Sequence, residues 1–210
     1  MYDLTSRVLY CEAAQHADEV VVTTQHVLAY RGNALFLSRK TWRVDDRGVL
    51  HGDIQVDIAS DIPEPARVGL SVHLAETPEN VSWLGLGPHE NYPDRKLAAQ
   101  QGRWTLPLAE MHTPYIFPTE NGLRCDTREL ALGTHQLNGR FHFSVSRYGQ
   151  QQLRETTHHH LLREEPGCWL NFDAFHMGVG GDDSWSPSVS PEFLLQTRQL
   201  RYTFSWQQNP

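Results

Sequence analysis

Two stretches of the chain alternate between apolar and polar residues at every second position. In Val49–Ala59 the apolar positions are Ile54, Val56 and Ile58, and acidic or amide side chains stand between them. Val68–Leu74 shows the same alternation, with glycine, serine and histidine at the intervening positions. A period of two is typical of a strand with one buried and one solvated face. Both stretches are therefore predicted to be β-strands.

Further strand-like runs fill most of the remaining chain. They are rich in β-branched and aromatic residues, and short turns such as Arg31-Gly32-Asn33 separate them. One short helix is predicted at Gln150–Thr156. This succession of strands predicts an all-β fold, a large sandwich of antiparallel sheets in one domain over residues 1–210. The additional predicted strands are Val20–Tyr30, Ala34–Val44, Leu123–Leu132, Arg140–Arg147, Cys168–Phe175 and Leu200–Trp206.

The middle of the chain follows neither the strand period nor the helical period. Between Trp83 and Gly122, prolines and scattered aromatic residues interrupt every periodic run. A long irregular segment in a compact domain is usually functional or lies across another surface. We therefore expect Trp83–Gly122 to be irregular and to serve one of these two purposes.

Composition and charge exclude several classes of protein. No run approaches the ~18 consecutive apolar residues of a membrane span, and the first residues do not resemble a secretory signal. Cys11, Cys125 and Cys168 are widely spaced and odd in number, which favours reduced thiols over a disulfide framework. These features predict a cytoplasmic protein without a membrane partner. A net charge of -7 disfavours a nucleic-acid partner.

Paired acidic residues are the first candidates for catalytic groups, and they occur at Asp45-Asp46, Glu164-Glu165 and Asp182-Asp183. Adjacent residues on a strand point to opposite faces. Such pairs are poor candidates for the two facing carboxyl groups of glycoside hydrolysis. We interpret Asp45-Asp46 as a solvated turn, because aspartate favours turns.

Histidines are the second candidates. His158-His159-His160 resembles a ligand cluster, but on a strand only the first and third would share a face. No companion spacing of metal ligands accompanies the run, so we interpret it as solvated and predict no metal site. His89-Glu90 offers acid–base groups in the irregular segment. The favoured interpretation is that they order this segment through hydrogen bonds to the backbone.

The stretch His176–Val189 has the composition of an ordered loop. Three glycines in four residues permit positive φ, and two carboxylates, a serine and Trp185 follow them. Loops held by a rigid scaffold often carry binding groups. The composition alone leaves two interpretations open: a functional loop that presents Trp185, or a glycine-rich connection whose tryptophan packs into the core.

Three long motifs carry a resemblance to a known family: Trp83–Arg95, Thr113–Arg124 and Gly178–Pro187, with shorter matches at Ser38–Thr41 and Ile58–Asp61. Together they resemble the large bacterial β-galactosidases of the lactose-operon type, in glycoside hydrolase family two. The motifs occur in the order and spacing of that family. The resemblance extends over nearly the whole chain.

The resemblance implies a part of a larger enzyme. It is to the C-terminal domain that follows the catalytic barrel, without the first strands of that domain and with the supersandwich fold of the galactose-mutarotase-like proteins. In that family the two catalytic glutamates, magnesium and a monovalent cation belong to the barrel. We therefore expect no catalytic residue and no cofactor within this chain, and no hydrolysis by it alone. The expected partners are a galactoside and the barrel, and the parent enzyme is expected to be a homo-oligomer.

The resemblance also implies one substrate contact, Trp185. An indole presents a large rigid face to the C–H groups of a sugar and a polar N–H at its edge. The carboxylates and the serine of the loop are expected to support it through backbone hydrogen bonds. The supporting residues are Gly180, Gly181, Asp182, Asp183 and Ser184.

Two other functions remain open at this point. A stand-alone carbohydrate-binding module is one, because the aromatic residues of Trp83–Phe117 could line a groove that buries a sugar face. A mutarotase-like epimerase is the other, although fold alone does not imply it. That activity needs a histidine and a glutamate facing one cavity, and no motif of that family is found in the sequence.

Overall fold

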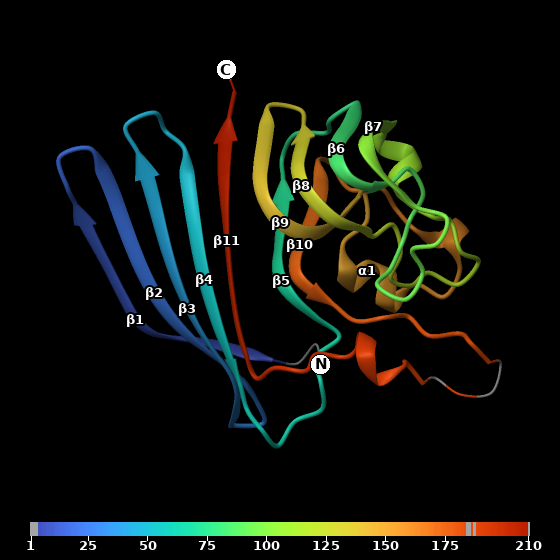
Figure 1. Ribbon diagram of the computed structural model, residues 1–210, viewed down its shortest axis with the longest axis horizontal. Coiled ribbons are helices and arrows are strands. Elements are labelled where there is room, and N and C mark those ends of the chain that lie inside the picture. Colours follow the sequence, from blue (N-terminus) through green and yellow to red (C-terminus); the bar gives the residue numbers. More distant parts are fainter. Residues whose placement is uncertain (1–3, 184–185, 187, 210) are drawn as a thin grey trace.

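The structure, a computed structural model, describes residues 4–183, 186 and 188–209 (Figure 1). The fold is all-β, as predicted, and the described residues contain one short helix, α1 (Gln150–Glu155). Single 3₁₀ turns occur at Leu108–Met111, His159–Leu161 and Pro191–Phe193. The strands are β1 (Thr5–Gln15), β2 (Glu19–Tyr30), β3 (Asn33–Asp45), β4 (Leu50–Ile58), β5 (Arg67–Leu74), β6 (Asn80–Gly87), β7 (Gln100–Pro107), β8 (Arg124–Leu132), β9 (His135–Ser146), β10 (Cys168–His176) and β11 (Gln199–Gln208).

All eleven strands found in the described residues belong to one antiparallel sheet that branches at β9. The sheet runs from β1 through β2, β3, β4 and β11 to β9, and from there through β8 and β6 to β7 (Figure 1). One edge of β9 pairs with β8. The other edge is divided, because His135–Gly139 pair with β11 and His142–Ser146 pair with β10. The branch that contains β10 and β5 thereby leaves the path of the main sheet.

This branching produces the predicted sandwich. The β5 branch packs against the main sheet through Val68, which lies in one cluster with Phe36 of β3 and Ile58 of β4. The larger core cluster lies around β9 and β10, where Phe143, Leu170 and other side chains are completely buried. Alternate positions of each strand point inward, so apolar residues at a period of two fill the space between the layers.

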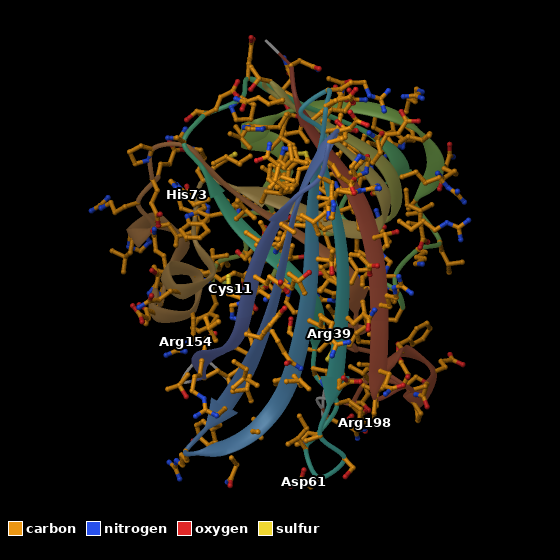
Figure 2. All side chains as sticks on the ribbon, turned by 90° about the vertical axis from the view of Figure 1, so that its left-hand side faces the viewer. Cys11, Arg39, Asp61, His73, Arg154 and Arg198 are labelled. Carbon is orange, nitrogen blue, oxygen red and sulfur yellow. The ribbon has the colours of Figure 1, made fainter. Side chains whose placement is uncertain are left out.

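The side chains of the outer strands β1 and β2 are far less buried than those of β9 and β10. Every residue of β1 is exposed, and β2 contains no buried residue. The pairing of β1 with β2 shifts register between Val8 and Tyr10, which marks a bulge at Leu9. Figure 2 looks at this side of the molecule and shows Cys11 on β1 and Arg39 on β3. The outer strands therefore form a sheet margin that the described residues leave largely uncovered.

The strands differ from the prediction in three respects. β1 lies before the first predicted strand, and the segment Trp83–Gly122 is not irregular throughout. β6 continues to Gly87, and β7 occupies Gln100–Pro107. The predicted strand at Arg140–Arg147 also begins earlier, at His135. The irregular parts that remain are residues 88–99 and 112–123, which lie beside the loop after β10.

None of the helices in the described part of the chain combines the length and the apolar character needed to cross a membrane.

Candidate functional site

The loop after β10 is tied to two neighbouring segments by its backbone. β10 ends at His176, and the next residue, Met177, donates its N–H to the Ala66 carbonyl at 2.8 Å. The N–H of Gly178 then donates to the Phe193 carbonyl at 3.1 Å. These bonds fix the direction in which the loop leaves the sheet. A loop fixed in this way by a rigid scaffold can carry a binding group at its tip.

A carboxylate from the 88–99 segment anchors the loop further along. The N–H of Gly180 donates to Oδ2 of Asp94 at 2.7 Å. Gly180 has φ +67°, and a Cβ added at Gly178 would lie 2.4 Å from the same carboxylate oxygen. Glycine is required at both positions, for the backbone conformation at one and for the close approach at the other. Asp94 therefore joins two of the three motifs on which the resemblance depends.

The predicted support residues behave in different ways. Oδ1 of Asp183 accepts the N–H of Ser186 at 2.6 Å, and its Oδ2 accepts the Ser186 hydroxyl at 3.0 Å. Gly181 has φ +94°, in the region that favours glycine, and Asp182 is exposed. Ser184 and Trp185 lie outside the described residues. The role of this loop in binding substrate stays a prediction.

Glu90 joins the motif Trp83–Arg95 to the motif Thr113–Arg124. Its carboxylate accepts the Gly122 N–H at 2.8 Å and the Thr113 hydroxyl at 2.9 Å, and the Tyr115 hydroxyl also donates to it. Although burial opposes the shift, these hydrogen bonds lower the pKa of Glu90. The interpretation that Glu90 orders the irregular segment is confirmed.

Arg124 also stabilises these irregular segments through hydrogen bonds. It is 2% exposed, and its guanidinium donates to the carbonyls of Pro88 and Gly122 at 3.2 and 2.8 Å and to that of Met111 at 3.4 Å. The guanidinium carbon also lies 5.6 Å from the ring centroid of Trp83. Burial lowers the pKa of Arg124 to about 10, so the side chain remains charged at neutral pH. A buried cation with carbonyl acceptors holds the irregular segments in one conformation.

A cleft of about 680 Å³ opens between these segments and the start of the loop. Its volume is within the range of roughly 300–1,000 Å³ that ligand sites occupy. Aromatic and aliphatic side chains line its sides, and a group of polar side chains lies at its floor. The residues that line it include Arg67, Tyr92, Tyr115, Phe117, Glu120 and His176.

The floor is organised around Arg67. Nη1 of this arginine lies 3.0 Å from Oε2 of Glu120, and Nη2 lies 2.6 Å from Oδ2 of Asp173. Burial raises the pKa of Asp173, and the adjacent guanidinium opposes this shift. Nε2 of His176 lies 3.9 Å from Oε1 of Glu120, while Nδ1 of the same ring lies 2.8 Å from the Met177 carbonyl. A carbonyl can only accept a hydrogen bond, so Nδ1 carries the proton of the neutral ring.

The remaining sequence candidates do not join this floor. Asp45 closes a turn by accepting the N–H groups of Arg47 and Val49, which confirms the interpretation as a turn. Hydrogen bonds from His51 and from these N–H groups lower the pKa of Asp45 to about 2. The histidine run begins a 3₁₀ turn at His159 and is not a strand. Among the described residues, no three histidine, cysteine or acidic side chains are grouped so as to hold a metal ion.

Sequence patterns gave no role to several residues of this site, including Arg67 at the floor of the cleft. Asp94 and Glu120 lie inside quoted motifs and His176 begins the loop, yet no role was given to them. Asp94 and its partner Gly180 are 86 positions apart, and Arg67 and Glu120 are 53 apart. No local pattern signals contacts over such separations. For Asp94 and Glu120, the usable signal was their presence in motifs that share one order and spacing.

Comparisons with known proteins agree with the resemblance. The family described as beta galactosidase small chain matches residues 3–206. A protein of Enterobacter cloacae named Beta-galactosidase is 90% identical over 210 residues, and one named Beta-galactosidase 2, also from Enterobacter cloacae, is 87% identical over 210 residues. The chain is covered completely in both alignments but spans 20% of the length of each relative. The match over nearly its whole length shows that the chain belongs to the beta galactosidase small chain family.

Proposed function

We propose that the chain is the C-terminal domain of a β-galactosidase of glycoside hydrolase family two, and that it completes the galactoside site with Trp185. The observation that carries the proposal is the family match over residues 3–206, together with relatives five times longer that are named beta-galactosidases. The motif Gly178–Pro187 supports the same assignment, since it resembles the loop that contributes a tryptophan to the substrate site in that family.

The local structure supports a presenting role for the loop. Asp94 fixes Gly180, the bonds to Ala66 and Phe193 fix the beginning, and the Asp183 carboxylate accepts the Ser186 N–H. A tethered loop loses little conformational freedom when a sugar binds, so less of the binding free energy is spent on ordering. The indole of Trp185 would stack on the apolar face of the galactose ring.

The proposal assigns binding to this chain and bond cleavage to the barrel. Glycoside hydrolysis needs two carboxyl groups placed about 5–9.5 Å apart across the sugar. Asp173 is 2% exposed, and it and Glu120 bind the same guanidinium, so this pair stabilises the floor of the cleft. The barrel would supply the glutamates, the magnesium and the monovalent cation, and contacts with it would support assembly of a homo-oligomer in the cytoplasm.

The test is a kinetic comparison in a full-length β-galactosidase that carries this chain. We expect Trp185→Ala to raise KM for lactose about tenfold and to lower kcat by a smaller factor, because stacking acts mainly in the ground state. Trp185→Phe keeps an aromatic face and should recover part of the affinity. The 210-residue chain alone should not hydrolyse lactose. An unchanged KM in Trp185→Ala would remove this residue from the substrate site.

Asp94 provides a second arm of the same experiment. Asp94→Ala removes the acceptor for the Gly180 N–H, whereas the amide oxygen in Asp94→Asn can still accept it. If Asp94 positions the loop, KM should rise in the alanine variant and recover in the asparagine variant, at nearly constant kcat. Equal losses of kcat in both variants would contradict a positioning role.

A further inference from the structure

Three polar atoms at the floor of the cleft have unused hydrogen-bonding capacity. Oε1 of Glu120 and the Tyr92 hydroxyl are buried, and neither has a hydrogen-bond partner among the described residues. Nε2 of His176 is 3.9 Å from Oε1 of Glu120, which is too long for a direct hydrogen bond. In the neutral ring the proton is on Nδ1, which donates to the Met177 carbonyl, so Nε2 is an acceptor. Glu120, Tyr92 and His176 all line the cleft, and the rings of Tyr92 and His176 lie 5.5 Å apart.

This arrangement selects the chemistry of a ligand. A buried polar group without a partner is costly, so such groups usually meet water or a bound molecule. Two neighbouring acceptors require a ligand that donates hydrogen bonds, such as one with several hydroxyl groups. A negatively charged ligand does not fit this cleft, because both terminal nitrogens of Arg67 already bind carboxylates, those of Glu120 and Asp173.

The rim of the cleft offers an apolar face above these polar atoms. Phe117 is 63% exposed and Tyr115 is 36% exposed, and both line the cleft. Large exposed aromatic side chains at the mouth of a pocket are typical of binding surfaces. A rigid ring can cover the C–H face of a sugar at a low cost in conformational entropy. Leu153 and Met177 add aliphatic surface between the rim and the floor.

We propose that this cleft binds a neutral pyranose, whose hydroxyl groups donate to Glu120 Oε1 and His176 Nε2 while one face of its ring lies against Tyr115 and Phe117. The Tyr92 hydroxyl is the third contact, to a ring or hydroxyl oxygen. This inference goes beyond the proposed function, because it uses neither Trp185 nor the barrel. It gives the chain a sugar site made only of its own residues.

Glu120 is held in place for this contact by bonds to its other oxygen. Oε2 accepts from Arg67 Nη1 at 3.0 Å and from the Gln150 side-chain amide at 3.2 Å. The carboxylate therefore cannot rotate freely, and Oε1 remains directed to the space beside His176. Burial and the charge of Glu120 raise the pKa of Tyr92, which agrees with a hydroxyl that stays protonated near this carboxylate. Preorganised polar groups of this kind bind without a large cost in ordering.

The experiment titrates the 210-residue chain with D-galactose, D-glucose and glycerol in a calorimeter. We expect a dissociation constant of about 1–10 mM for at least one of the two hexoses, because an open cleft with few polar anchors gives modest affinity. Glycerol, which has hydroxyls but no ring face, should bind at least tenfold more weakly. Histidine ring resonances in ¹H–¹⁵N spectra provide a second readout, and the His176 Nε2 signal should shift with added hexose.

Two conservative variants test the assigned contacts. Glu120→Gln keeps an acceptor for Arg67 but presents an amide N–H to His176 Nε2, so hexose affinity should fall about tenfold or more. Tyr92→Phe should weaken binding by a smaller factor. The matched control is Glu129→Gln, a carboxylate on β8 that pairs with Arg103 at 2.8 Å and does not line the cleft. Thermal unfolding of each variant verifies that the fold is retained.

Three results would overturn the inference. The first is the absence of both binding heat and a shift of the His176 signal when the hexose concentration is raised to 100 times the expected dissociation constant. The second is equal affinity in wild type and Glu120→Gln. The third is loss of hexose binding in Trp185→Ala but not in Glu120→Gln, which would place the sugar at the loop of the proposed function and leave that proposal intact. Conversely, binding lost only in Glu120→Gln supports this cleft even if Trp185→Ala leaves KM unchanged in the full-length enzyme.

Discussion

The outer strands β1 and β2 and the inner strands β8–β10 are built from the same kind of hydrogen-bonded ladder but differ in burial. β1 pairs with β2 from Thr5↔Ala29 to Gln15↔Val20, yet none of its residues is buried. β10 pairs on both edges and buries most of its length. Backbone pairing therefore forms strands in both regions. Only the inner strands add the burial of side chains, which is the dominant favourable contribution to folding.

The difference also explains where function is placed. The cleft and the loop are attached to the ends of β8 and β10, and Arg124 and Asp173 lie on these two strands. A site needs side chains whose rotamers are fixed by packing. The inner region provides such positions, and the outer strands do not. Three predictions test how sharply the two regions differ.

The largest effect is expected for Phe172, which is completely buried and contacts the rings of Phe141 and Phe204. Phe172→Ala should lower the free energy of unfolding by about 3–5 kcal/mol, through lost burial and the cavity left behind. Val8→Ala on β1 should change it by less than about 0.5 kcal/mol, because Val8 is 57% exposed. Urea unfolding followed by circular dichroism measures both. Similar losses in the two variants would show that the regions do not differ.

The second largest change in the free energy of unfolding is expected for Arg124, with Arg39 as the comparison. Arg124→Ala leaves buried carbonyls without their donor and should lower the free energy of unfolding by about 3 kcal/mol. Arg124→Lys keeps the charge but cannot reach all of these carbonyls, so an intermediate loss is expected. Arg39, an exposed residue of β3, is the control, and Arg39→Ala should stay within about 0.5 kcal/mol of wild type. The comparison fails if Arg124→Ala is as stable as Arg39→Ala.

The smallest effect concerns pH. Burial lowers the pKa of His142 on β9 to about 4, and its Nδ1 accepts the Asp126 N–H at 3.2 Å. Below the ordinary histidine pKa of about 6.5 the unfolded chain binds a proton that the folded chain does not. Stability should therefore be complete above pH 6.5 and be lost progressively as the pH drops from 6.5 toward 4.

His142→Asn tests this assignment. The asparagine side-chain oxygen can accept the same N–H but does not titrate, so the acid loss should become smaller. It should not vanish, because burial also lowers the pKa of His112 to about 4. Thermal unfolding midpoints between pH 7 and 4 give the profile. An unchanged profile in His142→Asn would exclude this histidine as a source of the acid sensitivity.

Sequence patterns predicted the strands whose two faces differ in burial. Ile54 and Ile58 alternate with solvated residues, and both are buried as expected. In β6 the alternation is real but hidden, because two of the four buried positions are Gly85 and Gly87. A Cβ at Gly85 would lie 2.7 Å from the Thr127 hydroxyl oxygen, so close packing requires a residue that carries no hydrophobic signal.

β1 was not predicted, for the opposite reason. Neither of its faces is buried, so its sequence has no need of an apolar stripe. The site was predictable only in part. The loop that begins after His176 was identified from its glycines, and Glu90 from its chemistry. Its anchor, Asp94, and the floor around Arg67 depend on contacts between distant segments, which local spacing does not encode.

The division of β9 between two partners limits which sequence changes the fold can tolerate. A single inserted or deleted residue in β9 would shift the register against β8, β10 and β11 at once, and each shift turns inward-facing side chains outward. The connection from Thr156 to Gly167 contains no β-strand, so it can change length without shifting the register of any strand pair. Natural variation in length among related chains should therefore collect in such connections and spare His135–Ser146.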